Sequence, residues 1–282
     1  MIDKNIAWKT AGHNDWFRVS MDPTLNIEII KSAQHLYVDF DSAGDQVATL
    51  IADRWAQKPL YLALSGGLDS EFIADRLVKN KIDFTPVILK IGQLNEIETW
   101  YAEYWCYKNN RVPVILNYSI SEFESAWDKF GPQLAELKHY DLVPQCILYD
   151  YANQQNAHLI YGAGDMQFDT NSQDQFYLHS FDLVSNIASV GEHPTSFYMY
   201  TPEILLSYIS GYDLTLSENY NKINAYEVSP RPKIGYQQSM SRDPQYFELK
   251  HRLSTRFNTL NVPHNKPCYF GTREQIIKKL TT

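Results

Sequence analysis

Residues that together could bind an oxyanion and a metal ion stand next to one another near the start of this 282-residue chain: Ser65, Gly66, Gly67, Leu68, Asp69 and Ser70. The two glycines let backbone N–H groups converge on a ligand without a Cβ atom in the way, and the two serine hydroxyls can donate to phosphate oxygens. Asp69 supplies a carboxylate of the kind that holds Mg²⁺. The string predicts a phosphate-binding loop; an ordinary glycine turn capped by serine and aspartate is the alternative.

The flanking residues predict how this string is positioned. Residues 60–64 form an uninterrupted apolar run of strand length, which suits a central parallel strand buried on both faces. After the string, Phe72, Ile73 and Leu77 recur with helical spacing. A strand, a glycine turn and a helix start in this order place the positive end of the helix dipole at the turn, where an anion binds favourably.

Strand and helix patterns alternate along the following residues. Strands are predicted at 84–90, 112–117 and 158–161. Helices are predicted at 41–55 with Ser42 as its cap, at 95–109, and at 132–138 and 150–156 around a break at Pro144. The apolar face of the helix at 95–109 is expected to comprise Ile97, Tyr101, Tyr104 and Trp105. This alternation predicts an open α/β sheet with parallel strands, whose ligands lie at the carboxyl ends of the strands where the strand order reverses.

The two ends of the chain differ from this α/β pattern. Residues 1–40 predict a small extension with short strands at 16–19 and 36–40, and residues 41–200 the α/β domain itself. Residues 201–282 predict a helical, basic region that completes the active site. It begins with a helix capped by Thr201 and ending near Gly211, and a final helix starts at Arg273.

Composition and charge narrow the class of protein. A hydrophobic content of 44% and a charged content of 21% are typical of a soluble globular protein, and no apolar run is long enough to span a bilayer. Cys106, Cys146 and Cys268 form no CxxC pair, so we expect a cytoplasmic protein. Residues 229–282 carry ten Lys and Arg against three Asp and Glu within a chain of net charge −8. This basic tail could face an anionic ligand or be a solvated surface, and the acidic remainder disfavours a nucleic-acid partner.

The string at 65–70 resembles the pyrophosphate loop of the N-type ATP pyrophosphatases, the PP-loop superfamily. Its spelling, SGGLDS, is most similar to the synthetase domain of asparagine synthases and β-lactam synthetases. No Gly-Lys-Ser/Thr follows the glycines, so it is not a Walker A loop. Two weaker strings follow in the order of that family. Residues 161–165 (YGAGD) resemble its Gly-x-Gly-x-Asp-Glu turn, and residues 229–236 (SPRPKIGY) resemble its late Pro-Lys-x-Gly-Phe segment.

The resemblance implies a HUP-like (adenine nucleotide alpha hydrolase-like) parallel sheet flanked by helices, with ATP and Mg²⁺ as cofactors. It assigns Mg²⁺ to Asp69 and Asp165, and catalysis to Asp69 and Lys233. The residues it assigns to ATP and pyrophosphate are Leu64, Ser65, Gly66, Gly67, Asp69, Ser70, Ile88, Leu89, Gly162 and Arg231. Ala163 and Met166 depart from acidic or tyrosine positions of the family, which leaves the attacking nucleophile open.

A long polar and aromatic segment from 167 to 196 is a separate candidate for substrate contacts. Loops of this length inside an α/β domain are often functional. Gln167 and Asp169 lie at its start and are our candidates for binding the substrate; an ordinary surface loop is the alternative.

The resemblance implies an ATP-dependent, AMP-forming ligase. Such an enzyme adenylates a carboxylate or amide oxygen of a small molecule, releases pyrophosphate and forms a C–N bond with ammonia or a substrate amine. Asparagine synthases begin with a glutaminase domain whose nucleophile is the cysteine after Met1. Here Ile2 follows Met1 and the loop begins at residue 65, so we expect a separate ammonia source. Because no apolar run has bilayer length, we expect no membrane partner.

Two other functions stay open. One is modification of a nucleobase or tRNA by the same adenylation, with amidation or with sulfur transfer through Cys146 or Cys268. The other is a nucleotide-binding sensor without turnover, which the departures at Ala163 and Met166 favour. The sequence determines neither the acceptor nor the oligomeric state.

Overall fold

A computed structural model of the chain describes residues 8–10, 16–20, 27–34, 39–135, 143–162, 167–168, 175–178, 194–213, 215–216, 221, 224–225, 248–249 and 268–282. The described residues fall into two compact units. Those of Met1–Ile51, Gly162–Glu227 and Lys266–Thr282 form one unit, and those of Ala52–Tyr161 and Val228–Asn265 form the other. The division at residues 40 and 200 stays a prediction.

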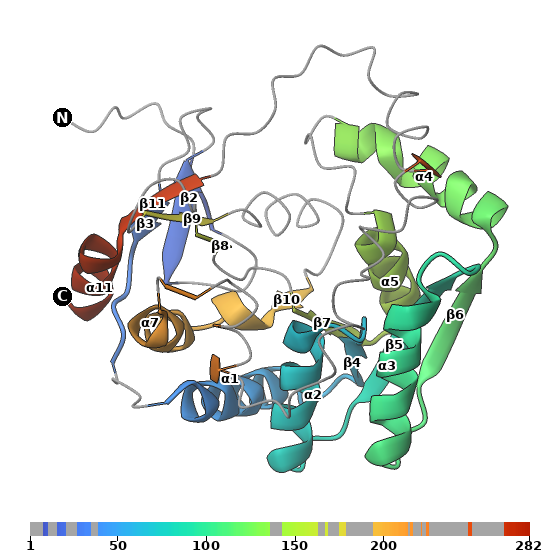
Figure 1. Ribbon diagram of the computed structural model, residues 1–282, viewed down its shortest axis with the longest axis horizontal. Helices are drawn as coiled ribbons and strands as arrows, with labels where there is room; N and C mark the ends of the chain where they lie inside the picture. The colour runs from blue at the N-terminus through green and yellow to red at the C-terminus, as the bar shows by residue number, and fades with distance from the viewer. Residues whose placement is uncertain are drawn as a thin grey trace. The chain divides into compact units, whose positions relative to one another are not determined.

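Four parallel strands form the centre of the second unit (Figure 1): β4 (Leu60–Ala63), β5 (Thr85–Ile91), β6 (Val114–Tyr118) and β7 (His158–Tyr161). Their order is β7-β4-β5-β6, and Leu62 of β4 lies opposite Pro86 on one side and Ile160 on the other. The chain runs from β4 outward to β5 and β6 and then returns to the far side of β4. The strand order therefore reverses between β4 and β7, which is where sheets of this kind bind ligands.

Helices cover both faces of these strands: α2 (Leu68–Lys79), α3 (Glu96–Lys108), α4 (Ile120–Ala135) and α5 (Val143–Gln154). On one face Lys90 of β5 forms an ion pair with Glu103 of α3. Side chains alternate between faces along a strand, and Tyr61 of β4 stacks on Tyr151 of α5 on the opposite face. The predicted α/β class, a parallel sheet flanked by helices, is confirmed.

Helices α1 and α5 begin differently from the prediction. Helix α1 (Phe40–Arg54) is capped by Asp39, whose Oδ1 accepts from the Ser42 N–H at 2.6 Å, so the prediction of Ser42 as the cap is wrong. Pro144 lies in the first turn of α5, where its missing N–H costs nothing, so the predicted break there is wrong.

Helix α4 begins twelve residues before the predicted start at residue 132. Ser119 and Glu122 form a capping box at its N-terminus: the Glu122 N–H donates to Ser119 Oγ, and Glu122 Oε2 accepts from the Ser119 N–H. The Ser119 hydroxyl, which donates to Glu122 Oε2 at 2.7 Å, and then the Ser119 N–H hold the pKa of the Glu122 carboxyl below its usual value.

Helix α3 packs on the sheet with a different face from the one predicted. Its buried residues are Thr99, Ala102, Trp105 and Cys106. Of the predicted face, Trp105 is buried, whereas Ile97 and Tyr104 are exposed. Threonine, alanine and cysteine are small enough to let the α3 backbone approach the strands closely, which leaves Ile97 and Tyr104 on the outside.

The first unit contains one of the two predicted short strands, that at residues 16–19, which corresponds to β2. Strands β1 (Trp8–Thr10), β2 (Phe17–Ser20) and β3 (Ile27–Ile29) form an antiparallel sheet in the order β1-β2-β3. Residues 35–38, in the other predicted strand, lie outside the described residues, and Phe40 begins α1 instead. The buried Trp16 indole donates to the Met199 carbonyl at 2.9 Å, which joins residues 183 positions apart in the chain.

The C-terminal part of this unit confirms two predicted helices. Helix α7 (Pro202–Gly211) follows Thr201, whose Oγ1 accepts from the Ile204 N–H, and α11 (Arg273–Thr281) begins at the predicted residue. Strand β11 (Cys268–Thr272) was not predicted; it pairs with β9 (Gln175–Leu178), which in turn pairs with β8 (Gln167–Phe168). The remaining short elements are β10 (Thr195–Ser196) and a 3₁₀ turn at Phe197–Met199.

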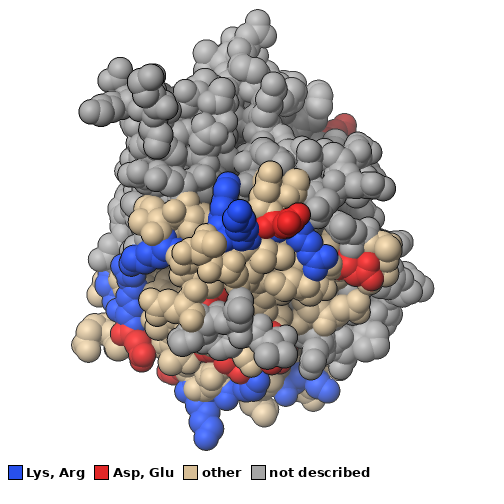
Figure 2. Space-filling model, turned by 90° about the vertical axis from the view of Figure 1, so that its left-hand side faces the viewer, with Lys and Arg blue, Asp and Glu red and all other residues tan. Residues whose placement is uncertain are grey.

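Charged side chains of both signs mix on the face shown in Figure 2, where Lys and Arg lie among Asp and Glu. From the basic tail the structure describes α11, in which Glu274 and Lys278 have the i, i+4 spacing of a helical ion pair. Arg273 donates to the Ser210 carbonyl at 2.6 Å. None of the described helices has the length and apolar character required to cross a membrane.

Candidate functional site

The loop between β4 and α2 adopts a tight turn rather than an extended conformation. Strand β4 ends at Ala63, the Leu64 N–H still donates to the Val87 carbonyl of β5 at 2.9 Å, and α2 begins at Leu68. The turn is therefore confined to Ser65, Gly66 and Gly67. It lies at the carboxyl end of β4, next to the position where the strand order reverses, so the N-terminus of α2 and its partial positive charge lie at the ligand-binding edge of the sheet.

Gly66 is a position where only glycine fits. Its φ angle is +87°, in the left-handed region. A Cβ atom at this residue would lie 2.0 Å from the backbone carbonyl oxygen of Glu98 and 3.1 Å from the amide nitrogen of Ala102. The loop thus rests directly on the backbone of α3, and this contact fixes its height above the sheet.

Four hydrogen bonds between the two serines and Gly67 close the turn. Ser70 Oγ accepts from the Ser65 N–H at 3.2 Å and donates to the Gly67 carbonyl at 3.0 Å. Ser65 Oγ accepts from the Gly67 N–H at 3.2 Å, and the two hydroxyl oxygens are 3.1 Å apart. In these bonds the Ser65 and Gly67 N–H groups both donate to serine hydroxyl oxygens and not to backbone carbonyls.

Counting protons separates the roles of the two hydroxyls. A serine has one O–H to donate, and that of Ser70 goes to the Gly67 carbonyl, so in the contact between the serines Ser65 is the donor. Ser70 is buried, whereas Ser65 is exposed. Ser70 therefore holds the turn together, and Ser65 is the hydroxyl that can turn towards an oxyanion.

Asp69 lies in the first turn of α2, one residue before Ser70. Its carboxylate is half-buried, and carboxylate and hydroxyl oxygens are the hard ligands that Mg²⁺ prefers. Within the described part of the chain no three His, Cys, Asp or Glu residues gather into a metal site. The second predicted carboxylate, Asp165, lies outside the described residues, as do Asp169, Arg231 and Lys233.

The remaining predicted residues lie at known positions in the fold. Gly162 directly follows the last residue of β7, the strand beside β4. Gln167 begins β8 and lies opposite Tyr177 of β9. Ile88 and Leu89 lie inside β5, which continues to Ile91, so the carboxyl end of this strand falls two residues beyond Leu89.

Asn95 is a site residue that the sequence did not single out. Strand β4 ends at Ala63, so the backbone groups of Leu89 and Ile91 lie beyond its end. The Asn95 side chain forms hydrogen bonds with both residues. Its Nδ2 donates to the Leu89 carbonyl at 2.7 Å, and its Oδ1 accepts from the Ile91 N–H at 2.8 Å. An asparagine before a helix normally suggests a cap, but the Asn95 side chain makes no capping hydrogen bond to α3. The residue type alone gives no signal for its role.

We expect Asn95→Ala to lower the free energy of unfolding by about 2–3 kcal/mol, because it leaves one buried N–H and one buried carbonyl without these partners. The matched control is Asn109→Ala at the other end of α3. Asn109 Nδ2 donates to the partly buried Trp105 carbonyl at 3.0 Å, and its loss should cost under about 1 kcal/mol. Urea denaturation of both variants measures the difference; equal losses would contradict the role given to Asn95.

The two described cysteine side chains are poor nucleophiles. Burial raises the pKa of the Cys146 thiol to about 11, and the neighbouring Asp150 carboxylate adds to the shift. Burial, followed by the Glu103 carboxylate, raises the pKa of Cys106 to about 11 as well. Both therefore remain protonated thiols at neutral pH.

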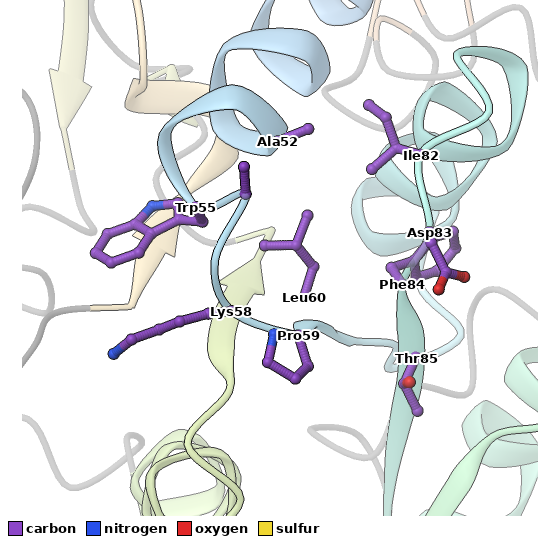
Figure 3. A pocket seen from close by; sticks show the side chains of 10 residues that line it. Ala52, Trp55, Lys58, Pro59, Leu60, Ile82, Asp83, Phe84 and Thr85 are labelled. Carbon is purple, nitrogen blue, oxygen red and sulfur yellow. The ribbon is translucent and has the colours of Figure 1, made fainter.

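A cavity of about 310 Å³ lies at the opposite edge of the sheet from the glycine loop (Figure 3). Leu60 and Thr85, at the amino ends of β4 and β5, line it together with Ile82 and Phe84. Because sheets of this order bind ligands at the carboxyl ends of their strands, the glycine loop and not this cavity is the candidate site.

Comparison with known proteins found similar structures but no similar sequences. No protein-family model matches the chain, and no curated protein matches it. An NH3-dependent NAD synthetase from Campylobacter jejuni superposes with a TM-score of 0.41 at 16% identity, covering 79% of this chain and 95% of that one.

Two further solved structures are similar at the same level. An NMN synthetase from Francisella tularensis has a TM-score of 0.37 and 13% identity over 82% of this chain and 100% of that one. A U34-tRNA thiolase from Methanococcus maripaludis has a TM-score of 0.36 and 11% identity over 79% of this chain and 82% of that one. The fold described above rests on the strand order of this chain, and the site on its own residues.

Proposed function

We propose that this chain is an ATP pyrophosphatase of the PP-loop type, which cleaves ATP to AMP and pyrophosphate. The observation that carries the proposal is the loop at residues 65–70. It combines a left-handed glycine, two joined serine hydroxyls and the N-terminus of α2 at the edge where the strand order reverses. This arrangement suits an oxyanion, because the exposed Ser65 hydroxyl and the N-terminus of α2 lie together in one short turn.

The finer proposal is an AMP-forming ligase that makes a C–N bond. In this proposal the Ser65 hydroxyl and the loop amides bind the β- and γ-phosphates of ATP, and a carboxylate or amide oxygen of a small molecule attacks the α-phosphate. Pyrophosphate leaves, and ammonia or a substrate amine then displaces AMP from the acyl carbon. Such a reaction depends mainly on positioning and on stabilising the charge that develops on the phosphate oxygens.

Residues of this chain have distinct roles in the proposal. Mg²⁺ would be held by Asp69 and Asp165, and would neutralise charge between the phosphates. Lys233 and Arg231 would add positive charge at the α-phosphate and the pyrophosphate. Leu64, Ile88, Leu89 and Gly162 would contact the nucleotide through backbone groups, and Gln167 and Asp169 would bind the acceptor.

The alternatives differ in how they agree with the described side chains. Sulfur transfer needs a thiolate, and the raised pKa of Cys146 disfavours it in that role. A sensor that binds ATP without turnover needs the loop alone. It stays the second candidate, since Ala163 and Met166 stand where the family has catalytic side chains.

The test uses the full chain with ATP, Mg²⁺, ammonia and a panel of carboxylates and amides, each labelled with oxygen-18 at the acceptor oxygen. We expect AMP and pyrophosphate in equal amounts, only when the right acceptor is present, with one labelled oxygen transferred to AMP. Formation of ADP would contradict the whole proposal. ATP binding measured by calorimetry without pyrophosphate formation from any acceptor would favour the sensor.

A further inference from the structure

Tyr161, the last residue of β7, carries a buried hydroxyl group that needs a partner. The residue exposes only 5% of its surface. Within the described residues no group forms a hydrogen bond with its Oη atom. Burial raises the pKa of the phenol above its ordinary value, so the hydroxyl keeps its proton and remains a hydrogen-bond donor at neutral pH. A buried donor without a partner costs free energy, and a bound ligand that supplies an acceptor removes this cost.

Gln145, in the first turn of α5, carries a second buried polar atom of this kind. Its Oε1 atom is buried, and no donor from the part of the chain that the structure describes forms a hydrogen bond with it. Gln145 lies three residues before Leu148 and seven before Ala152, which are both buried, so it shares their face of the helix. A carboxamide oxygen accepts from N–H and O–H groups. The pair therefore offers one unsatisfied donor, Tyr161, and one unsatisfied acceptor, Gln145.

The two residues lie on the same face of the sheet and at a similar height. Tyr61 of β4 stacks on Tyr151 of α5 and lies opposite Leu159 of β7. Tyr161 follows Leu159 by two residues and therefore points to the face that α5 covers. Helix α5 packs on β7, and three residues separate the end of the helix from the start of the strand. From this connection Gln145 lies about 14 Å back along the helix, and Tyr161 lies about 10 Å along the strand.

This height is also that of the glycine loop. Leu62 of β4 lies opposite Ile160 of β7, so Tyr161 is level with Ala63, the last residue of β4. The backbones of neighbouring strands are about 5 Å apart, and the loop begins two residues after Ala63, at Ser65. A small molecule that reacts with a nucleotide held by the loop would therefore lie within reach of Tyr161.

We propose that Tyr161 and Gln145 bind the acceptor of the reaction, and that this acceptor is an amide and not a carboxylate. The inference rests on the proposed function, which leaves both acceptors open. An amide group carries a carbonyl oxygen that accepts from the Tyr161 hydroxyl and an N–H that donates to Gln145 Oε1. A carboxylate has acceptors alone, so it would leave the Gln145 oxygen unsatisfied. The two side chains are also neutral, so neither offers a carboxylate the counter-charge that burial requires.

The reaction of an amide needs nothing beyond ATP, the amide and the amine. The amide oxygen forms a bond to the α-phosphorus, the bond from that phosphorus to the bridging oxygen breaks, and one amide proton leaves with pyrophosphate. The nitrogen of ammonia or of the amine then forms a bond to the amide carbon. The bond from this carbon to the oxygen of AMP breaks, and the proton that the amine loses leaves with AMP. The product is an amidine.

The first test compares acceptors with the full chain, ATP, Mg²⁺ and ammonia. Each carboxylic acid of the panel is paired with the primary amide of the same carbon skeleton, and pyrophosphate is measured. We expect pyrophosphate with an amide, and a rate at least about a hundredfold lower with the matching acid. An equal or faster rate with the acid would overturn this inference and leave the proposed function standing. No pyrophosphate from any acceptor would contradict the proposed function and this inference together.

The second test removes each hydrogen-bonding group separately. Tyr161→Phe deletes the hydroxyl and keeps the ring, and Gln145→Met deletes the carboxamide at similar length. Each should raise the KM of the amide about tenfold and leave the dissociation constant of ATP unchanged. The matched control is Tyr61→Phe, which removes a hydroxyl from the same face of the sheet nearer its amino edge and should leave the KM unchanged.

A stability measurement separates ligand binding from a structural role. Because the Tyr161 hydroxyl has no hydrogen bond to any described residue, Tyr161→Phe should keep or raise the midpoint of urea denaturation. A hydroxyl that held the fold together would give the opposite result. A lower midpoint in Tyr161→Phe, or an unchanged KM in either variant, would overturn the assignment.

Discussion

Gly66→Ala is expected to lower the free energy of unfolding by about 3 kcal/mol and to abolish ATP binding. Two costs combine. The left-handed φ of +87° strains any residue with a Cβ atom, and that atom would lie 2.0 Å from the Glu98 carbonyl oxygen. The obstacle is backbone inside α3, which cannot move aside as the end of a flexible side chain can. The loop must therefore lift off α3, which also changes the direction of its amides.

Urea denaturation measures the first effect, and calorimetry with ATP and Mg²⁺ measures the second. The matched control is Gly211→Ala at the end of α7, where an added Cβ atom has no neighbour within 4 Å. That variant should change the stability by no more than about 0.5 kcal/mol. Wild-type stability of Gly66→Ala would show that the glycine loop does not rest on α3 as described.

Asp69→Asn is expected to lower the rate of pyrophosphate formation about a thousandfold while leaving the fold intact. The amide has the same shape as the carboxylate but no charge, so it holds Mg²⁺ poorly next to the phosphates. Since Asp69 is only half-buried, the stability should change by less than about 1 kcal/mol. The measurement is the rate as a function of Mg²⁺ concentration, which should require far more metal in the variant.

A suitable control is Glu274→Gln, which removes a carboxylate from the first turn of α11 instead of α2. It tests whether the loss of a carboxylate from the first turn of any helix lowers the rate, and we expect the rate of this variant to be unchanged. If Asp69→Asn kept the wild-type rate and the wild-type dependence on Mg²⁺, the metal role of Asp69 would be wrong. ATP affinity without Mg²⁺ should be equal in the variant and the wild type or slightly tighter in the variant, because one negative charge near the phosphates is gone.

Local patterns in the sequence determined most of the sheet and the centre of the candidate site. The apolar runs at 60–64, 84–90, 112–117 and 158–161 each correspond to a strand. Strands β5 and β7 are buried almost throughout, as a continuous apolar run predicts, whereas β6 at the end of the strand order is only partly buried. The glycine loop was equally clear. Its chemistry depends on six consecutive residues, and the structure brings Ser65, Gly67 and Ser70 together through hydrogen bonds within that string.

The sequence prediction was wrong for the start of α4 and for the buried face of α3. The Ser119-x-x-Glu122 spacing of a capping box precedes α4, yet the helix was placed at its far end. In α3, apolar side chains surround most of the helix, so periodicity could not tell which side faces the sheet. Small residues, Thr99 and Ala102, took the inner side because the backbone of α3 must approach the glycine loop.

The sequence by itself determined which residues form the phosphate loop and that a parallel sheet carries it, since both depend on neighbours in the chain. Only the tertiary structure decided what lies against that loop. The Glu98 carbonyl below Gly66 comes from a helix some thirty residues further on, and the Asn95 amide that completes the edge of β5 stands directly before that helix. The Glu98 contact is made by a backbone carbonyl and the Asn95 contact by a common polar side chain. The packing of α3 on the sheet therefore fixes both contacts, and neither can be predicted from residue type.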